Sequence, residues 1–202
     1  MSLTISEKKE SSVPLLEPGT YSAVCFMLID LGMQYNENFK TSAKKVLIGW
    51  EIVGETVDIG GESQPRTFSK LYTASLNDKA TLRKHLDAWR GRPFTEEELA
   101  AFDLKSIVGA PCLITVIHNS GSNGNTYANL ASIASLPKGF PRPSLTVSPT
   151  VYDIDEDDPA AVDKLPKWIA EMIRKSSSYE ERLAKAGQQS FTELPDDGEL
   201  PF

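Results

Sequence analysis

Apolar and polar positions alternate along much of the first 136 residues, with the two-residue period that places successive side chains on opposite faces of a β-strand. The runs are rich in β-branched and aromatic residues, and polar or glycine-rich loops at 32–43 and 55–65 separate the first three. In the second run, four apolar residues share one face: Val46, Ile48, Trp50 and Ile52. The pattern predicts five strands, over residues 20–31, 45–53, 66–73, 111–118 and 126–134.

The period changes between the third and fourth strands. Here the sequence predicts a helix over residues 78–90, with Asn77 as its N-cap and Gly91 at its end. Spacings of i, i+4 and i+7 give this helix one buried stripe, which consists of Leu82, Leu86 and Trp89. A short acidic helix is expected over residues 95–102.

Three strands, a helix and two strands form the element order of the OB-fold. We therefore expect a mainly β protein with helices, in which residues 18–138 form a five-stranded OB-type Greek-key barrel. The helix would lie between strands three and four. An SH3-like barrel also has five strands, but it normally lacks a helix of this length at that position.

The composition changes after the barrel. Residues 139–165 are rich in proline, carry the acidic run 153–158, and are predicted to be a linker. Residues 166–187 are predicted to be helical, with Pro166 in the first turn, a capping box of Ser178 and Glu181, and Gly187 at the end. Two terminal segments complete the organisation: a flexible N-terminus over residues 1–17 and a disordered acidic tail over residues 188–202.

The second predicted helical segment carries an apolar patch formed by Trp168, Ile169, Met172 and Ile173. Such a patch needs a partner surface, since exposed apolar area is costly in water. Two outcomes are expected: the patch pairs chains in a homo-oligomer, or it folds back on the barrel.

The net charge of −7 is concentrated near the end of the chain. Residues 1–149 hold 15 acidic and 15 basic side chains, whereas residues 150–202 hold 13 acidic and 6 basic ones. Within the body, residues 40–92 carry ten basic residues against six acidic ones. A body with a local basic excess can meet a polyanion while the acidic tail competes for the same surface.

Several function classes receive little support from the residues. No run approaches the roughly 20 apolar residues that span a bilayer, and residues 1–17 lack the apolar core of a secretory signal, which predicts a cytoplasmic protein without membrane partners. Cys25 and Cys112 lie in apolar runs and are expected to be buried, with no metal site and no cofactor. No phosphate-binding glycine loop or placed nucleophile is present, so we do not expect an enzyme.

Strand three carries the first candidate binding residues. Phe68, Lys70 and Tyr72 alternate onto one face, and Arg66 precedes them. Sequence-tolerant binding of a single strand requires cations along a groove and aromatic faces on which bases stack, and the face of strands two and three is the usual OB binding surface. The alternative is that Phe68 and Tyr72 line the core.

The first loop and the helix carry further candidates. Exposed aromatics interleaved with lysines suit stacking and phosphate contact, although these residues could equally cap the barrel: Tyr35, Phe39, Lys40, Lys44 and Lys45. On the helix, Lys79 and Arg83 share a stripe that continues to Arg90 and Arg92, either as a solvated face or as a phosphate contact around Gly91.

The C-terminal tip places carboxylates before an apolar pair and a final aromatic: Asp196, Asp197, Glu199, Leu200, Pro201 and Phe202. Such a peptide can bind a partner, because the ring fills an apolar pocket while the carboxylates meet a basic rim. The tip resembles that of bacterial single-stranded DNA-binding proteins, with Gly198 and Leu200 as departures. In that family the tip docks replication, recombination and repair proteins.

A second resemblance lies in the body. Residues 71–77 (LYTASLN) and 82–94 (LRKHLDAWRGRPF) resemble a group of small proteins from bacteriophage and prophage replication modules, and the similarity extends over roughly residues 18–138. This resemblance implies a protein that coats single strands in the cytoplasm of a bacterial host.

These observations predict a protein that binds single-stranded DNA with little sequence preference during DNA replication, recombination or repair. The acidic tip would recruit partner proteins and compete with DNA for the barrel. The main alternative is a protein–protein adaptor whose OB-like barrel does not contact nucleic acid, which the balanced charge of the body favours. A recombination mediator or nuclease accessory that binds DNA only beside an enzyme is a third.

Overall fold

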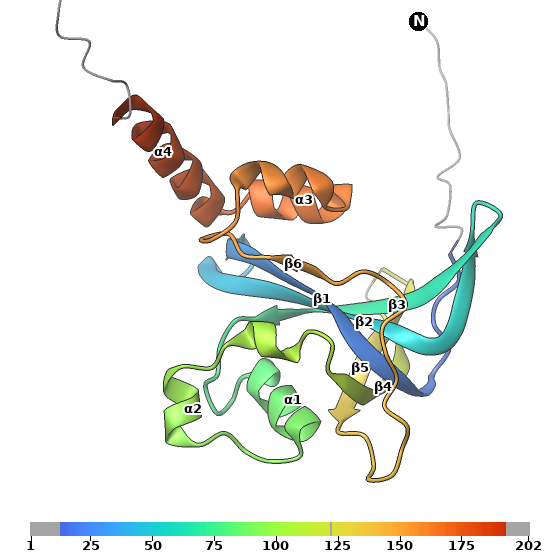
Figure 1. The fold of residues 1–202 in the computed structure, drawn as a ribbon. Helices are drawn as coiled ribbons and strands as arrows, with labels where there is room; N and C mark the ends of the chain where they lie inside the picture. The colour runs from blue at the N-terminus through green and yellow to red at the C-terminus, as the bar shows by residue number, and fades with distance from the viewer. Residues whose placement is uncertain (1–12, 122, 193–202) are drawn as a thin grey trace, which may run out of the picture.

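A computed structural model describes residues 13–121 and 123–192 as a curled antiparallel sheet with helices on both of its faces (Figure 1). The strands are β1 (Gly19–Asn36), β2 (Thr41–Ile59), β3 (Glu62–Thr73), β4 (Pro111–Ser120), β5 (Thr126–Ala134) and β6 (Thr150–Tyr152). The helices are α1 (Thr81–Arg90), α2 (Glu96–Ala100), α3 (Lys167–Arg174) and α4 (Ser177–Thr192), with the 3-10 turns η1 (Leu104–Ile107) and η2 (Pro159–Lys164). The fold is therefore mainly β, as predicted.

The order across the sheet is β3-β2-β1-β4-β5. The short strand β6 pairs in parallel with Met27–Ile29 of β1, after the residues of β1 that pair with β4. All five predicted strands are present, but the first three are longer than expected. The predicted loops at 32–43 and 55–65 are mostly paired strand, because polar residues in a hairpin satisfy their backbone groups across the ladder. In the first hairpin, the turn shrinks to residues 37–40.

One face of the sheet forms an inner core with α1. Leu82, Leu86 and Trp89 are all buried there, which confirms the predicted stripe. Trp89 lies 6.0 Å from Trp50, measured between ring centroids, and its Nε1 donates to the carbonyl of Pro111 at 3.0 Å. Helix α1 also contacts both β3 and β5, the two ends of the sheet path.

The start of α1 differs from the prediction. The helix begins at Thr81 with Ala80 as its N-cap, whereas Asn77 begins a separate turn, in which its carbonyl accepts from the N–H of Ala80 at 2.9 Å. The side chain of Asn77 accepts from the backbone N–H of Lys79 at 3.1 Å, so it satisfies a turn donor in place of a helix donor. Gly91 ends the helix in the left-handed region at φ 70°, as predicted.

The opposite face of the sheet carries an outer core that the sequence did not predict. Met27, Ile29 and Leu31 of β1 alternate with the inner-core residues of the same strand. They pack against side chains of the C-terminal third of the chain: Tyr152, Ile154, Val162, Ile169, Ala170, Ile173 and Tyr179. Helices α3 and α4 therefore cover the side of the sheet opposite α1 and α2 (Figure 1).

Residues 139–165, predicted to be a linker, are instead fixed to the sheet. Thr146 and Val147 donate backbone N–H groups to the buried carboxylate of Glu51 at 2.9 and 3.1 Å. The strand β6 then adds to β1 at Met27–Ile29. Proline-rich composition suggests a linker because proline cannot donate to a ladder, but a three-residue strand needs few donors.

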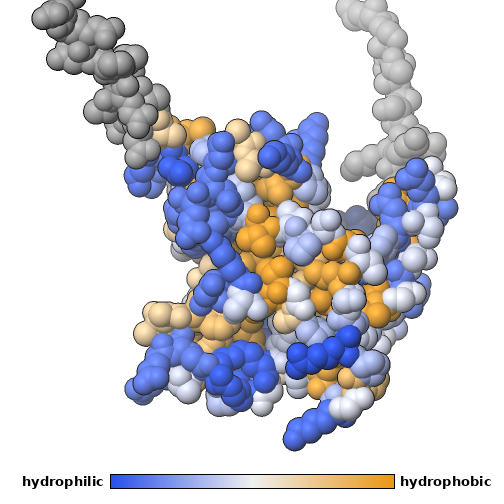
Figure 2. Space-filling model, viewed as in Figure 1, coloured by the Kyte–Doolittle hydropathy of each residue, from blue (hydrophilic) through white to orange (hydrophobic). Residues whose placement is uncertain are grey.

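The apolar patch on α3 was expected either to pair chains or to fold back on the barrel, and its residues differ in burial. Ile169 and Ile173 fold back onto the sheet as part of the outer core, whereas Trp168 stands 50% exposed. Figure 2 shows hydrophobic side chains at the surface between the helices above and below the sheet, flanked by hydrophilic residues. Pairing of chains stays a prediction.

Helix α4 corrects the predicted capping and end of the C-terminal helical segment. Ser176 provides the cap, since its Oγ accepts from the N–H of Tyr179 at 3.1 Å, whereas Ser178 accepts from the N–H of Met33 on β1. The helix also continues past Gly187 to Thr192. A glycine inside a helix costs about 1 kcal/mol relative to alanine, which does not by itself end a helix.

The remaining predictions concern the N-terminal segment, the two cysteines and membrane-spanning helices. In the N-terminal segment predicted to be flexible, Leu16 is buried in the inner core and its carbonyl lies 2.8 Å from Nε2 of His118, whereas Pro14, Leu15 and Glu17 are exposed. Cys25 and Cys112 are buried free thiols, as predicted. Within the described ranges, no helix is long and apolar enough to cross a membrane.

Candidate nucleic-acid interface

The tip of the β1–β2 hairpin presents two aromatic side chains to solvent. Tyr35 is 62% exposed and Phe39 is 77% exposed. The turn is held by Asn36, whose side chain accepts from the backbone N–H groups of Asn38 and Phe39 at 3.0 and 3.2 Å. Lys40 closes the turn at φ 50°, so two aromatics and a lysine share one hairpin tip.

A pocket of about 540 Å³ lies where β2 and β3 meet the start of α1. Three lysines, from β2, β3 and the turn before α1, line it: Lys45, Lys70 and Lys79. The remaining lining residues are Leu71, Tyr72, Thr73, Ser75, Asn77, Ala80, Thr81 and Leu82. We call this the lysine pocket; it contains no carboxylate among its lining residues, so its field is positive.

The lysine pocket is pre-formed by local contacts. Lys45 donates its Nζ to the hydroxyl of Thr73 across the β2–β3 ladder at 2.7 Å. Ala80, Thr81 and Leu82, at the start of α1, line the pocket, and the N-cap Ala80 makes no side-chain cap hydrogen bond to the first N–H groups of the helix. The positive end of the helix dipole therefore adds to the charge of the three lysines.

The face of β3 has a different role from the one expected. Tyr72 is 3% exposed and belongs to the inner core, so a base cannot stack on it. Its hydroxyl is hydrogen-bonded to Nδ1 of His85 at 2.8 Å, while Phe68 is half-buried against the same core. The core alternative is therefore correct for both rings. Lys70 shares their face but lies at the pocket, 5.7 Å from the centre of the Tyr72 ring.

Burial also shifts the pKa values of the two hydrogen-bonded side chains beneath the pocket, Tyr72 and His85. Burial raises the pKa of the Tyr72 hydroxyl, so this side chain stays neutral. Burial lowers the pKa of His85, and the positive charge of Lys70 lowers it further. The pocket floor therefore holds a neutral pair below the cations.

Lys44 does not belong to the pocket. Its Nζ lies 2.8 Å from a carboxylate oxygen of Asp30 and 3.5 Å from one of Asp155. Partial burial acts to lower the pKa of Lys44, but the hydrogen bond and charge of Asp30, together with Asp155, outweigh it and the pKa is raised. Lys44 is thus neutralised by carboxylates from β1 and from the segment after β6.

Asp30 and Asp155, together with Asp153, form an acidic group whose spacing would suit a metal ion. It is the one such group found in the described ranges. Lys44 and Lys105 contact this group, with Lys105 3.0 Å from Asp153. These lysines supply the balancing charge that a cation would supply.

The arginines around the end of α1 are paired with Glu98. Arg92 makes a bidentate contact with this carboxylate at 2.6 and 2.9 Å, and Arg90 contacts it as well. The Arg92 hydrogen bonds are the main cause that lowers the pKa of Glu98 to about 2. Arg90 also stacks 4.1 Å over the centre of the Phe94 ring, so it joins α1 to α2.

Two other predicted arginines also make internal contacts. Arg83 donates to the carbonyl of Leu76 at 3.1 Å and lies 3.9 Å from Asp87. Arg66 donates to the carbonyl of Pro14 and so holds the N-terminal segment against β3. Of the predicted cations, the structure therefore brings Lys45, Lys70 and Lys79 together at the lysine pocket, whereas Arg90 and Arg92 meet at the carboxylate of Glu98.

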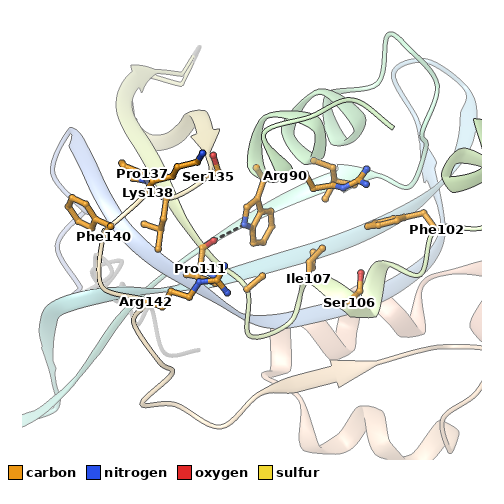
Figure 3. A pocket seen from close by; sticks show the side chains of 15 residues that line it. Arg90, Phe102, Ser106, Ile107, Pro111, Ser135, Pro137, Lys138, Phe140 and Arg142 are labelled. Carbon is orange, nitrogen blue, oxygen red and sulfur yellow. Dashed lines mark hydrogen bonds between the residues drawn. The ribbon is translucent and has the colours of Figure 1, made fainter. Parts of the chain in front are cut away.

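The sequence interpretation missed a second group, at the boundary between the predicted barrel (18–138) and the predicted linker (139–165). Lys138, Phe140 and Arg142 line a pocket of about 570 Å³ beside α1 and η1 (Figure 3). The signal was readable, because cations alternate with an aromatic residue over 138–142. The C-terminal tip, residues 196–202, lies outside the described residues.

The geometry is the main guide to function, since no family model matches the chain and no curated protein matches it significantly.

Proposed function

We propose that this protein binds single-stranded DNA with little sequence preference, through the lysine pocket and the exposed hairpin tip. Phosphates would lie against Lys45, Lys70 and Lys79, and bases would stack on Tyr35 and Phe39. The observation that carries the proposal is the meeting of three lysines, from β2, β3 and the turn before α1, in one pocket without a lining carboxylate. Sequence-tolerant binding needs this combination of cations and stacking faces.

We also propose that the curled sheet is an OB-type Greek-key barrel. The strand order and the position of α1 between β3 and β4 support this assignment. The two ends of the sheet path, β3 and β5, both contact α1, which would bridge the opening of the barrel. In an OB-fold the β2–β3 face and its neighbouring loops bind oligonucleotides, and the lysine pocket lies at the end of that face.

The acidic tip would recruit replication, recombination or repair proteins in the cytoplasm. Its carboxylates and Phe202 suit a pocket with a basic rim. The same carboxylates are complementary to the lysine pocket, so the tip would also compete with DNA at low salt.

The proposal is tested by titrating fluorescent oligo-dT of about 16 nucleotides, the upper end of an OB site, against the protein at several salt concentrations. A duplex of equal length serves as the comparison. Each phosphate contact on a single strand contributes about 0.7 to the salt slope, or roughly fivefold in affinity at about 0.1 M salt. Changing Lys45, Lys70 and Lys79 to Ala should therefore lower the slope by about 2 and the affinity by roughly 100-fold.

The matched control replaces three exposed lysines on the other side of the sheet: Lys164, Lys167 and Lys175. This variant has the same net charge as the test variant, so equal losses in both would show that only overall charge matters. No binding of the wild-type protein at low salt would refute the proposal and leave the adaptor alternative.

A further inference from the structure

The pocket in Figure 3 lies between the segment that follows β5 and the second half of α1. Its floor is apolar and includes Leu86, Trp89 and Ile107, which belong to the inner core. Ser135, Pro137 and Lys138 form one rim, while Arg90 and Phe102 lie on the other side (Figure 3). We call it the Phe140 pocket.

All charged residues that line the Phe140 pocket are cations. Its lining holds three cations, Arg90, Lys138 and Arg142, and no carboxylate. Lys138 and Arg142 are exposed, and within the described ranges neither forms a salt bridge. Arg90 is paired with Glu98 through Nη2, but its Nη1 is buried without a hydrogen-bond partner in the described structure. The donors that an anion in the pocket can reach are therefore those of Lys138 and Arg142, since Nη1 of Arg90 is buried.

Phe140 stands on the rim with 53% of its side chain exposed. A turn fixes its backbone: the N–H of Phe140 donates to the carbonyl of Pro137 at 3.2 Å, and Gly139 has φ 84°. Pro141 and Pro143 further restrict Phe140 and Arg142, the residues that precede them. The backbone that carries the aromatic ring of Phe140 and the cation of Arg142 is thus restrained before any ligand arrives, which lowers the ordering cost of binding.

The Phe140 pocket and the lysine pocket lie at opposite ends of helix α1. Helix α1 contributes its first turn to the lysine pocket and Leu86, Trp89 and Arg90 to the Phe140 pocket. Ten helical residues span about 15 Å, so the two pockets lie about one short helix apart. A single strand of a few nucleotides can therefore reach from one pocket to the other.

We propose that the Phe140 pocket is a second contact site for single-stranded DNA, in which a base stacks on Phe140 and the adjacent phosphates bind Lys138 and Arg142. This inference rests on the proposed function and extends it, because it assigns DNA contacts to a segment outside the OB-type face. An acidic peptide with a terminal aromatic residue is the other ligand of suitable charge. The ring of such a peptide would occupy only the apolar floor, whereas a base would stack on the exposed ring of Phe140, so the exposure of Phe140 favours DNA.

The test uses the full-length protein and an oligo-dT of about 16 nucleotides. Stacking on one aromatic residue is lost in Phe140→Ala, which should weaken binding by roughly 5- to 100-fold. Arg142→Ala should weaken it by about fivefold at ~0.1 M salt and lower the salt slope by about 0.7. Two controls match these changes, Trp168→Ala with a side chain 50% exposed and Lys175→Ala with an exposed cation, and both should stay within twofold of wild type.

A second measurement does not depend on variants. Oligo-dT with a photoreactive thymine should crosslink to the peptide that contains residues 137–142 when mapped by mass spectrometry. Wild-type binding with unchanged affinity in both variants and no crosslink in this peptide overturns the second site alone. No wild-type binding overturns the proposed function, and this site with it. A synthetic peptide of residues 193–202 that binds wild type but not Arg142→Ala, while both proteins bind oligo-dT equally, also overturns the inference.

Discussion

Glu51 is the polar anchor of the outer face, and its removal makes a sharp test of how the C-terminal third is held. The side chain is 5% exposed. Its Oε2 accepts the backbone N–H groups of Thr146 and Val147 at 2.9 and 3.1 Å, and its Oε1 accepts the hydroxyl of Thr146 at 2.5 Å. These contacts fix the segment that leads into β6.

The contacts allow the effects of two substitutions to be separated. In Glu51→Gln, the amide oxygen can take the place of Oε2 and the amide nitrogen can donate to the hydroxyl of Thr146, so all three hydrogen bonds persist. Only the charge assistance is lost, which lowers the free energy of unfolding by ~1–2 kcal/mol. In Glu51→Ala, all three bonds are lost and two backbone donors lose their acceptor, so we expect a loss of ~3–5 kcal/mol.

The pH dependence follows from the same contacts. Burial acts to raise the pKa of Glu51, but the hydrogen bonds from Thr146 and Val147 outweigh it, and the pKa is lowered. A lowered pKa in the folded state stabilises the protein above the unfolded value of about 4.5, and this contribution is lost as the pH falls through the folded pKa. The difference between wild type and Glu51→Gln should therefore be full at pH 7 and should shrink as the pH falls below about 4.5.

The assay is urea denaturation followed by circular dichroism over this pH range. Glu55→Gln is the control, because Glu55 lies on the same strand but is exposed, and it should be neutral within ~0.5 kcal/mol. The reasoning is refuted if Glu51→Gln is as damaging as Glu51→Ala at pH 7. It is also refuted if the loss in Glu51→Gln persists unchanged in acid.

Three further predictions concern other parts of the chain. Ile173→Ala should lower the free energy of unfolding by ~2–5 kcal/mol in urea titrations, because this side chain is fully buried in the outer core, and a loss below 1 kcal/mol would mean that α3 is not part of the folding unit. The pKa of His85 is lowered in the folded state, so the fold has its full stability above the unfolded value of about 6.5, where His85 is neutral, and loses stability as the pH falls. The urea midpoint should therefore drop between pH 7.5 and 5.5. The drop should be smaller in His85→Gln. Deleting residues 193–202 should tighten oligo-dT binding at low salt but not at high salt; equal affinity at low salt would remove the competing role of the tail.

Local periodicity determined much of the fold from the sequence. The two-residue alternation marked all five strands of the sheet path, and the Leu82, Leu86 and Trp89 stripe marked α1, because these signals depend only on neighbours in the chain. The outer core is also marked in the sequence. Residues 23–29 are all apolar, which is typical of a strand covered on both faces.

The candidate site was only partly readable, since alternation shows which residues share a face but not which face turns inward. Phe68, Lys70 and Tyr72 share one face of β3, and the tertiary structure buries Tyr72 while leaving Lys70 at the lysine pocket. Proline content likewise predicted a linker where residues 138–142 form a rim.

The charge of a site depends still more on the tertiary structure. Arg90 and Arg92 looked available for phosphate, yet Glu98 binds both, and Lys44 is taken by Asp30 and Asp155. The sequence by itself determined the strands, the helix stripe and the positions of the cations, because each follows from local spacing. Only the tertiary structure decided which cations keep their charge for a ligand, because the carboxylates that neutralise the others come from different elements and meet them only after folding.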